Sequence, residues 1–195
     1  MTTNATFPGF DHVYLLGTTG SNVVFHTSID LSVEEGFAVV RGELEVQEPV
    51  TVRWVSGRRK PQDFVWTSIV APIVVSDKVL TALGAIRATG WVCYPVDLRG
   101  ADDEPIPGYS GVSVLGRCGP IQSERSVPTK KQYPGGIFSV NQGYFFDERS
   151  WDGSDLFMPA DRSGIVFVVE RVMHALVKAG AKGMEMKRAD LAVLP

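Results

Sequence analysis

Acidic side chains gather around one tryptophan in a turn-rich part of the sequence. Trp151 follows Asp147 and Glu148 and precedes Asp152 and Asp155. A tryptophan offers a large contact area, and nearby carboxylates attract a basic protein surface. We therefore interpret these five residues as candidate partner-binding residues. In the alternative interpretation, Trp151 points inward and closes one end of the hydrophobic core.

A second acidic group lies in the loop around residues 99–108. It consists of Asp102, Asp103 and Glu104 and is followed by two prolines. Adjacent carboxylates on a loop are usually solvated, because an unpaired charge is costly to bury. We include these three residues in the candidate partner-binding surface. The sequence does not show whether the two acidic segments are neighbours.

Metal-binding patterns are not apparent. The three histidines, His12, His26 and His174, are scattered and lack the close spacing that zinc ligands need. The acidic residues near Gly153 do not match the twelve-residue calcium loop. We expect no metal and no cofactor.

Catalytic motifs are equally hard to find. The sequence contains neither a GxSxG nucleophile elbow nor a phosphate-binding loop with its lysine. We expect a protein that is not an enzyme. The alternative is an enzyme or small-ligand protein whose pocket assembles from distant residues such as Tyr109, His174 or Cys93. A third hypothesis is a structural subunit of a larger assembly.

Composition narrows the possible partners and the compartment. The 195 residues are 44% hydrophobic and carry a formal charge of −3, so the chain has no general attraction for nucleic acids. The basic stretch 58–60 is interpreted as a solvated turn. No apolar run approaches the ~20 residues that span a bilayer, and the N-terminus does not resemble a signal peptide. With two cysteines and no disulfide framework, we expect a cytoplasmic protein.

The clearest element prediction covers residues 64–98. An apolar run at 69–75 indicates a strand, and Ser76 is a natural N-cap whose hydroxyl accepts a backbone hydrogen bond. Val79, Ala82, Leu83 and Ile86 then repeat at helical spacing, and Gly90 is suited to end the helix in a left-handed conformation. A second apolar run at 91–96 predicts another strand.

The same pattern recurs 93 residues later. The shift places Phe64 on Phe157 and Gly90 on Gly183. Chance matching of apolar periodicity is the alternative explanation. We predict a second strand-helix-strand unit, with a strand near 165–169, a helix near 170–179 and a strand near 183–187.

The remaining segments are expected to be mostly β. Short apolar runs at 13–16, 23–25, 37–40, 44–46 and 50–55 predict an N-terminal antiparallel β meander within residues 1–60. Residues 119–136 are expected to be irregular, and 137–146 to form a hairpin. The predicted fold class is therefore α+β: a meander (1–60), followed by an α+β region (61–195) with two related halves. We expect the meander and this region to form one compact unit.

The stretch from Ile73 to Leu80, with Gly90 and the later Tyr94-Pro95-Val96, resembles an immunity-protein family from bacterial polymorphic-toxin systems. The resemblance covers roughly residues 63–194. Its second half rests on Leu156-Phe157, on residues 168–176 and on 183–186. The middle departs from the family pattern, because Gln122 stands before Ser126 where the family often has an aspartate.

The resemblance implies a small, non-catalytic cytoplasmic protein. Such a protein neutralises a cognate toxin by binding it, and has neither nucleic acid nor membrane as a partner. The alternative that the residues leave open is a small-ligand-binding protein or enzyme, with its pocket between the meander and the helical units.

Overall fold

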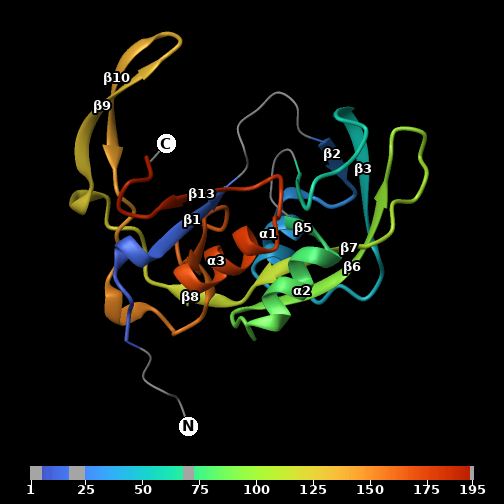
Figure 1. The fold of residues 1–195 in the computed structure, drawn as a ribbon, viewed down its shortest axis with the longest axis horizontal. Coiled ribbons are helices and arrows are strands. Elements are labelled where there is room, and N and C mark those ends of the chain that lie inside the picture. The colour runs from blue at the N-terminus through green and yellow to red at the C-terminus, as the bar shows by residue number, and fades with distance from the viewer. Residues whose placement is uncertain (1–5, 18–24, 68–72, 194–195) are drawn as a thin grey trace.

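The computed structural model describes residues 6–17, 25–67 and 73–193 (Figure 1). About 40% of the chain lies in strands and 20% in helices. The predicted α+β class, with a meander followed by strand-helix-strand units, is therefore wrong. The protein is mostly β, and two sheets and one separate hairpin account for its strands in the described ranges.

One sheet has six strands and is nearly closed. Their order is β2-β3-β6-β7-β5-β4, and a parallel bridge from Thr27 to Thr67 joins the two outer strands. The sheet therefore curls into a barrel-like shape around a small core that includes Val52, Val74 and Tyr94. Its strands are β2 (Phe25–Ile29), β3 (Val50–Gly57), β4 (Phe64–Trp66), β5 (Ile73–Ser76), β6 (Trp91–Arg99) and β7 (Tyr109–Val114).

The other sheet has five strands in the order β13-β1-β12-β11-β8. Most of its neighbouring strands are antiparallel, and β11 and β8 are parallel. Its strands are β1 (Val13–Gly17), β8 (Gly116–Cys118), β11 (Leu156–Pro159), β12 (Val166–Val169) and β13 (Glu185–Arg188).

The strands within residues 6–17 and 25–60 divide between these two sheets and form no meander there. Residues 23 and 24 of the predicted run 23–25 lie outside the described residues. Strand β1 pairs with β12 and β13, while β3 lies parallel to β6. The apolar run at 37–40 belongs to helix α1 (Val33–Val40). A capping box explains the difference, because Glu35 N donates to Ser32 Oγ at 3.2 Å and Ser32 N donates to the Glu35 carboxylate at 2.9 Å. Residues 44–46 are not a strand.

Helices α2 (Asp77–Ala85) and α3 (Glu170–Lys178) lie where the sequence predicts helices. Ser76 stands at the N-cap of α2, but its hydroxyl donates to Asp63 Oδ1 at 2.8 Å and makes no capping bond. The left-handed residue that follows α2 is Arg87, with φ of 49°. Gly90 is also left-handed, with φ of 83°, and precedes β6.

Each of these helices connects two strands that do not pair with each other. Strand β7 lies between β5 and β6, and β1 lies between β12 and β13. The predicted strand-helix-strand units are therefore incomplete on their own. Each needs an antiparallel strand from elsewhere in the chain to fill the gap between its two parallel strands.

The two halves join through reciprocal contacts. Leu156 N donates to the carbonyl of Thr89, which precedes β6, at 3.1 Å. Phe64 N donates to the carbonyl of Lys182, which precedes β13, at 3.0 Å. Thr89 and Lys182 are 93 residues apart, the same interval that separates α2 from α3. Helices α2 and α3 pack side by side between these joints (Figure 1).

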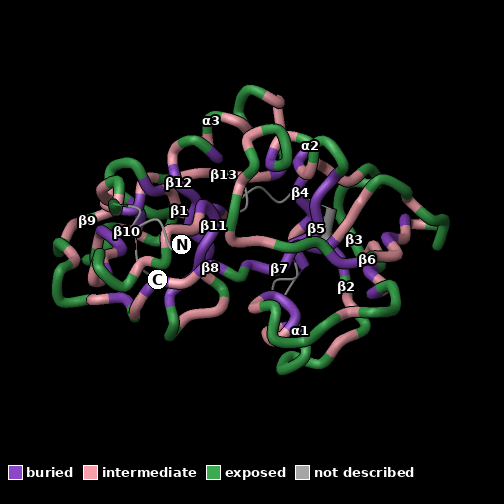
Figure 2. The backbone as a smooth tube through the Cα atoms, turned by 90° about the horizontal axis from the view of Figure 1, so that it is seen from below, coloured by how far each residue is buried: buried purple, intermediate pink, exposed green. Residues whose placement is uncertain are grey.

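The larger hydrophobic core lies between the two sheets. Strand β5 is buried on both sides, because Ile73 and Val75 belong to this core and Val74 to the barrel core. Phe146, Phe157 and Phe167 are the largest fully buried side chains. Figure 2 shows the buried segments following the strands of both sheets, with more exposed chain around them.

A long hairpin projects from the body of the molecule. Strands β9 (Val127–Tyr133) and β10 (Gly136–Gln142) pair with each other and form a sheet of their own (Figure 1). The predictions for this region are wrong: residues 119–136 are not wholly irregular, and no hairpin turn occurs at 141–143. Pro134 and Gly135 make the turn, as expected for a Pro-Gly pair between two strands.

Candidate functional site

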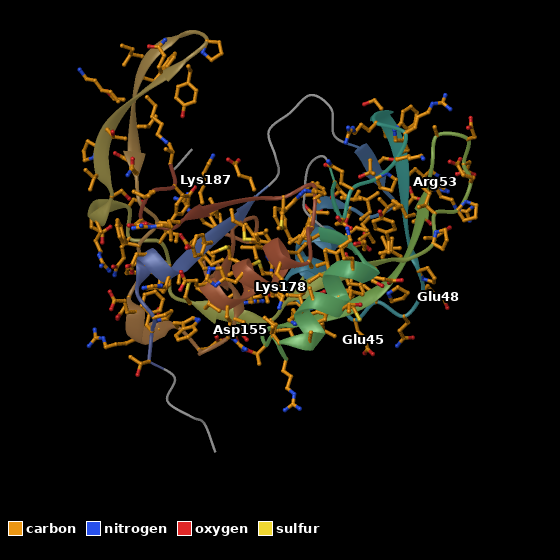
Figure 3. The ribbon with its side chains drawn as sticks, viewed as in Figure 1. Glu45, Glu48, Arg53, Asp155, Lys178 and Lys187 are labelled. Carbon is orange, nitrogen blue, oxygen red and sulfur yellow. The ribbon has the colours of Figure 1, made fainter. Side chains whose placement is uncertain are left out.

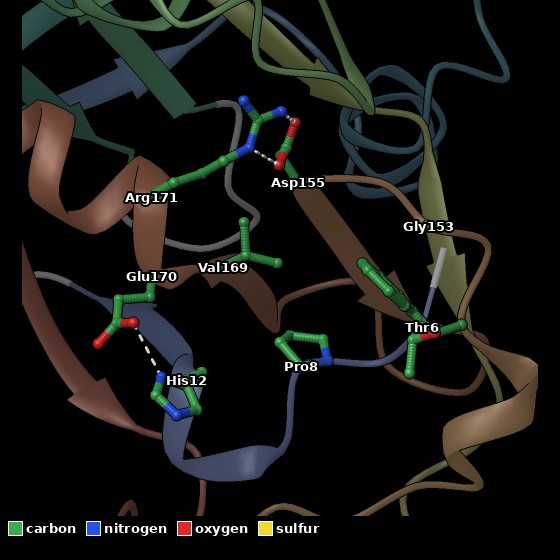
Figure 4. A pocket seen from close by; sticks show the side chains of 9 residues that line it. Thr6, Pro8, His12, Gly153, Asp155, Val169, Glu170 and Arg171 are labelled. Carbon is green, nitrogen blue, oxygen red and sulfur yellow. Dashed lines mark hydrogen bonds and ion pairs between the residues drawn. The ribbon is translucent and has the colours of Figure 1, made fainter. Parts of the chain in front are cut away.

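A pocket of about 570 Å³ brings together three segments that are distant in the sequence. The N-terminal segment 6–12, the loop 151–155 and the start of α3 form its walls (Figure 4). Two of the predicted site residues, Trp151 and Asp155, line it. The complete lining is Thr6, Pro8, His12, Trp151, Gly153, Asp155, Val169, Glu170 and Arg171.

Trp151 forms an aromatic wall of this pocket and is held on several sides. Its ring centroid lies 5.6 Å from that of Phe7 and 6.0 Å from that of Phe157. Its indole Nε1 donates to the carbonyl of Ser154 at 3.0 Å. The side chain is half-buried. Trp151 therefore both supports the core and presents a fixed aromatic surface to the pocket.

Asp155 is buried, with 5% of its surface exposed. Its carboxylate accepts bonds from Arg171 Nε at 2.6 Å and from Arg171 Nη2. It also accepts from Thr89 N at 2.8 Å and from Thr89 Oγ1 at 2.9 Å. The Asp155 carboxylate therefore joins the two halves of the protein from a buried position. Its partners reach the surface, because the Arg171 side chain is 52% exposed and Thr89 is also exposed.

His12 and Glu170 form a charged pair at the other side of the pocket (Figure 4). His12 Nδ1 lies 2.8 Å from Glu170 Oε2, and its Nε2 lies 3.6 Å from Asp11. The hydrogen bond to Glu170 raises the pKa of His12 above its ordinary value of 6.5, and the negative charge of Asp11 acts in the same direction. Glu170 is the first residue of α3, where a carboxylate is favoured by the helix dipole.

The remaining predicted acidic residues of this region organise the loop beside the pocket. Asp147 accepts from the backbone and guanidinium of Arg149, and this bonding lowers the pKa of the Asp147 carboxyl. Asp152 accepts from Arg117 N at 2.7 Å. Glu148 is exposed and lies 3.8 Å from a guanidinium nitrogen of Arg125. Glu148 is thus the least constrained of the three.

The other acidic segment lies elsewhere, in the loop between β6 and β7. Asp103 Oδ1 is 3.8 Å from Arg53 Nε, and Asp102 Oδ2 is 3.5 Å from Arg59. Glu104 accepts from Asp102 N at 2.8 Å. Arg53 lies on β3 of the six-stranded sheet, and Arg59 lies in the loop that follows β3. Figure 3 shows Arg53 well away from Asp155. The structure does not bring the two acidic segments together.

Among the residues missed by the sequence prediction, three are the ionisable residues His12, Glu170 and Arg171. One signal was available, because the shift of 93 aligns Lys78 with Arg171. Lys78 Nζ contacts Asp63 at 3.0 Å, and this ion pair is the counterpart of the Arg171–Asp155 pair. His12 lies far from α3 in the sequence, and no pattern around His12 indicates its contact with Glu170.

Residues suggested for an assembled catalytic pocket do not converge. Cys93 is exposed on β6, His174 is exposed on α3, and Tyr109 packs against the barrel core. Within the described ranges, no three His, Cys, Asp or Glu side chains are grouped so that they could hold a metal ion. No described helix combines the length and apolar character needed to cross a membrane. No known family model matches the sequence, and no curated protein is significantly similar to it.

Proposed function

We propose that this chain is a non-catalytic immunity protein that binds and neutralises a cognate bacterial toxin in the cytoplasm. The observation that carries the proposal is the pocket beside Trp151. It is preformed, has an aromatic wall and is bordered by carboxylates, which are features of a binding site for a basic protein surface. The resemblance to immunity proteins supports the same function.

The charge around the pocket favours a basic partner. The bordering segments 6–12, 147–155 and 169–171 carry more carboxylates than guanidinium groups. The carboxylates belong to Asp11, Asp147, Glu148, Asp152, Asp155 and Glu170, and the guanidinium groups to Arg149 and Arg171. Such an excess attracts a basic surface before contact, so it accelerates association and disfavours acidic partners.

A basic side chain of the toxin fits this pocket chemically. An arginine or lysine placed against the indole of Trp151 gains a cation–π interaction of about 0.5–2 kcal/mol. Its charge then lies near Glu170, whose carboxylate contacts the exposed His12. Occlusion of a toxin needs no chemistry from the binding protein. It needs a rigid surface, and the packing of Trp151 on Phe7 and Phe157 supplies one.

A small-ligand protein is the second candidate, and the size of the pocket favours it. Its volume of about 570 Å³ falls within the range of roughly 300–1,000 Å³ that small-molecule sites occupy. The sequence-based alternative placed the pocket between the meander and the helical units. The described residues form no such meander, so the pocket lies elsewhere. Most of its charged groups are already paired with each other, which leaves few polar groups to orient a small molecule.

The deciding experiment is a growth-rescue assay combined with direct binding. The toxin domain encoded beside this gene is expressed in bacteria with and without the full chain, and the dissociation constant is measured by calorimetry. The double variant E148K/E170K reverses one charge that lines the pocket, Glu170, and one exposed charge on the loop beside it, Glu148. The matched control D102K/E104K reverses two exposed charges on the other acidic loop.

We expect the wild-type chain to restore growth, and E148K/E170K to weaken binding by roughly tenfold or more because two attractive contacts become repulsive. The control should bind as the wild type does. If the toxin is never neutralised or bound, the immunity function is wrong. If only the control variant loses binding, the toxin binds at the loop between β6 and β7, and our choice of the pocket is wrong.

A further inference from the structure

A second hollow of about 650 Å³ lies between the projecting hairpin and the five-stranded sheet. We call it the hairpin groove. Tyr133, Phe138 and Val140 of the hairpin form one wall, and Leu15 of β1 lies opposite. Lys131 and Lys187 complete its rim, and Figure 3 shows Lys187 near the base of the hairpin. The other lining residues are Ser139, Ala192 and Val193.

The pairing register assigns one face of the hairpin to this groove. Lys131 stands opposite Phe138, and Thr129 stands opposite Val140. Side chains alternate along a strand, so these residues and Tyr133 share the groove face. The opposite face carries Lys130, Gln132 and Ile137.

The groove face is apolar and open to solvent. Tyr133 and Phe138 are 41% and 48% exposed, although their ring centroids lie only 5.9 Å apart in an edge-to-face arrangement. Exposed aromatic side chains that already contact each other form a ready apolar surface. Surfaces of this kind usually mark a binding site.

The charged groups at the groove are basic. None of its lining residues is acidic, and Lys131 makes no ion pair with any residue in the described ranges. Lys187 contacts Glu185 at 3.1 Å, which leaves part of its hydrogen-bonding capacity for another carboxylate. The groove therefore has a positive rim around an apolar floor, whereas the Trp151 pocket lies among carboxylates.

The strand that carries Lys187 offers a place where an extended chain can add. Strand β13 forms the last strand of its sheet, and no strand within the described ranges pairs with its outer edge. An unpaired edge presents backbone groups to which an extended peptide can add. Leu15 and Lys187 are cross-strand partners on β1 and β13, so the groove lies over the face of this sheet beside that edge. A chain that continues from the edge into the groove meets the aromatic face of the hairpin.

We propose that the hairpin groove binds an extended acidic segment of a protein partner. An apolar side chain of that segment packs on Tyr133 and Phe138, while carboxylates on either side of it pair with Lys131 and Lys187. A second copy of this chain is a poorer occupant, because a twofold contact through this face brings the same lysines together. The groove is separate from the Trp151 pocket, so this proposal goes beyond the proposed immunity function and does not depend on it.

Peptide binding to the full chain tests the proposal. The probe is a fluorescein-labelled peptide about twelve residues long that alternates glutamate with leucine or tyrosine, followed by fluorescence anisotropy. The comparison peptide has lysine in place of each glutamate. We expect the acidic peptide to bind, the basic peptide not to bind, and the affinity of the acidic peptide to fall as salt rises.

Matched variants on the two faces of the hairpin locate the binding. K131E and F138S change the groove face, whereas K130E and I137S make the same kinds of change on the opposite face. Ile137 is 68% exposed, more than Phe138, so I137S is a demanding control. We expect the groove variants to bind the acidic peptide at least roughly tenfold more weakly, and the control variants to bind as the wild type does.

Several results would overturn the proposal. These are equal binding of the acidic and basic peptides, equal losses from both faces, or no binding of the acidic peptide. Sedimentation showing a dimer that F138S dissociates would assign the groove to a second copy. Binding to phosphatidylglycerol vesicles without peptide binding would assign it to a lipid surface. The E148K/E170K variant separates the two proposals, because it should lose toxin binding and keep peptide binding.

Discussion

Removal of the Asp155 carboxylate should destabilise the whole protein. The carboxylate is buried, and it accepts bonds from two nitrogens of Arg171 and from the backbone and hydroxyl of Thr89. Breaking a buried ion pair by removing one partner costs about 3–5 kcal/mol. Arg171 is half exposed and can be hydrated again, so we place Asp155→Ala near the lower end, at about 3 kcal/mol.

Urea unfolding with a double-mutant cycle measures this energy and its origin. The cycle compares Asp155→Ala, Arg171→Ala and the double variant with the wild type. We expect a coupling energy of at least about 1.5 kcal/mol, because each single change removes the same charged hydrogen bonds. Glu148→Ala is the control, since its ion pair of 3.8 Å is exposed and should contribute less than about 0.5 kcal/mol.

The outcome discriminates between two roles of Asp155. A loss of stability below about 1 kcal/mol for Asp155→Ala, or strictly additive single changes, would refute the structural role argued from these contacts. A stable Asp155→Ala variant that loses toxin binding would instead support the direct partner contact that the sequence suggested. The structure predicts the opposite result, because the carboxylate has little surface to offer a partner.

Three further predictions follow from single residues. An NMR titration of His12 should have its midpoint above pH 6.5, and Glu170→Gln should lower that midpoint. Because the pKa of His12 is raised in the folded state, the pair stabilises the fold fully below pH 6.5, and this contribution disappears as the pH rises through the folded pKa. Arg87→Gly should stabilise the protein by about 0.5 kcal/mol in thermal or urea unfolding, and Arg87→Ala should not, because the residue is left-handed. A thiol reagent should modify exposed Cys93 quickly and Cys118 only on unfolding, because burial raises the pKa of Cys118 to about 12.

Local patterns in the sequence were sufficient to place two of the helices. Val79 and Leu83 of α2, and Val172 and Leu176 of α3, repeat at helical spacing and are all buried. Burial of one helix face is a local property, so its periodicity is visible without any knowledge of the fold. The apolar run at 37–40 is too short to show a periodicity, because four apolar residues fit a strand or a helix equally well. The capping box at Ser32 decided the outcome.

Strand pairing could not be predicted because it depends on distant segments. Val13 pairs with Val169, and Leu16 pairs with Met186. An apolar run predicts a buried strand but carries no information about which strand lies beside it. The meander prediction assumed that neighbours in the sequence pair with each other, and β1 violates that assumption.

The site residues show the same distinction between local and distant information. Asp152 and Asp155 lie in the same turn-rich segment and look alike in the sequence, yet Asp152 is exposed and Asp155 is buried. Their difference arises from Arg171 and Thr89, which surround only Asp155. Whether a carboxylate faces a partner or holds the fold together is therefore decided by residues outside its own segment.

The reciprocal joints explain why Asp63 and Asp155 occur where they do. Asp63 accepts from Lys182 N at 2.9 Å, just as Asp155 accepts from Thr89 N, so each aspartate holds the turn that follows the helix of the other half. Gly183 and Gly90 occupy matching positions in the two joints, and both are left-handed. A Cβ added at Gly183 would lie 2.6 Å from the carbonyl oxygen of Phe64, and one added at Gly90 would lie 2.2 Å from that of Leu156.

A side chain at either glycine would push the halves apart, and loss of either aspartate would remove the acceptor of one backbone N–H group, that of Thr89 or of Lys182. The acidic residues nearest the core are thus constrained by this joint. Under the proposed function, toxin recognition would fall to the exposed carboxylates around the Trp151 pocket, which can change with the partner while the fold is preserved.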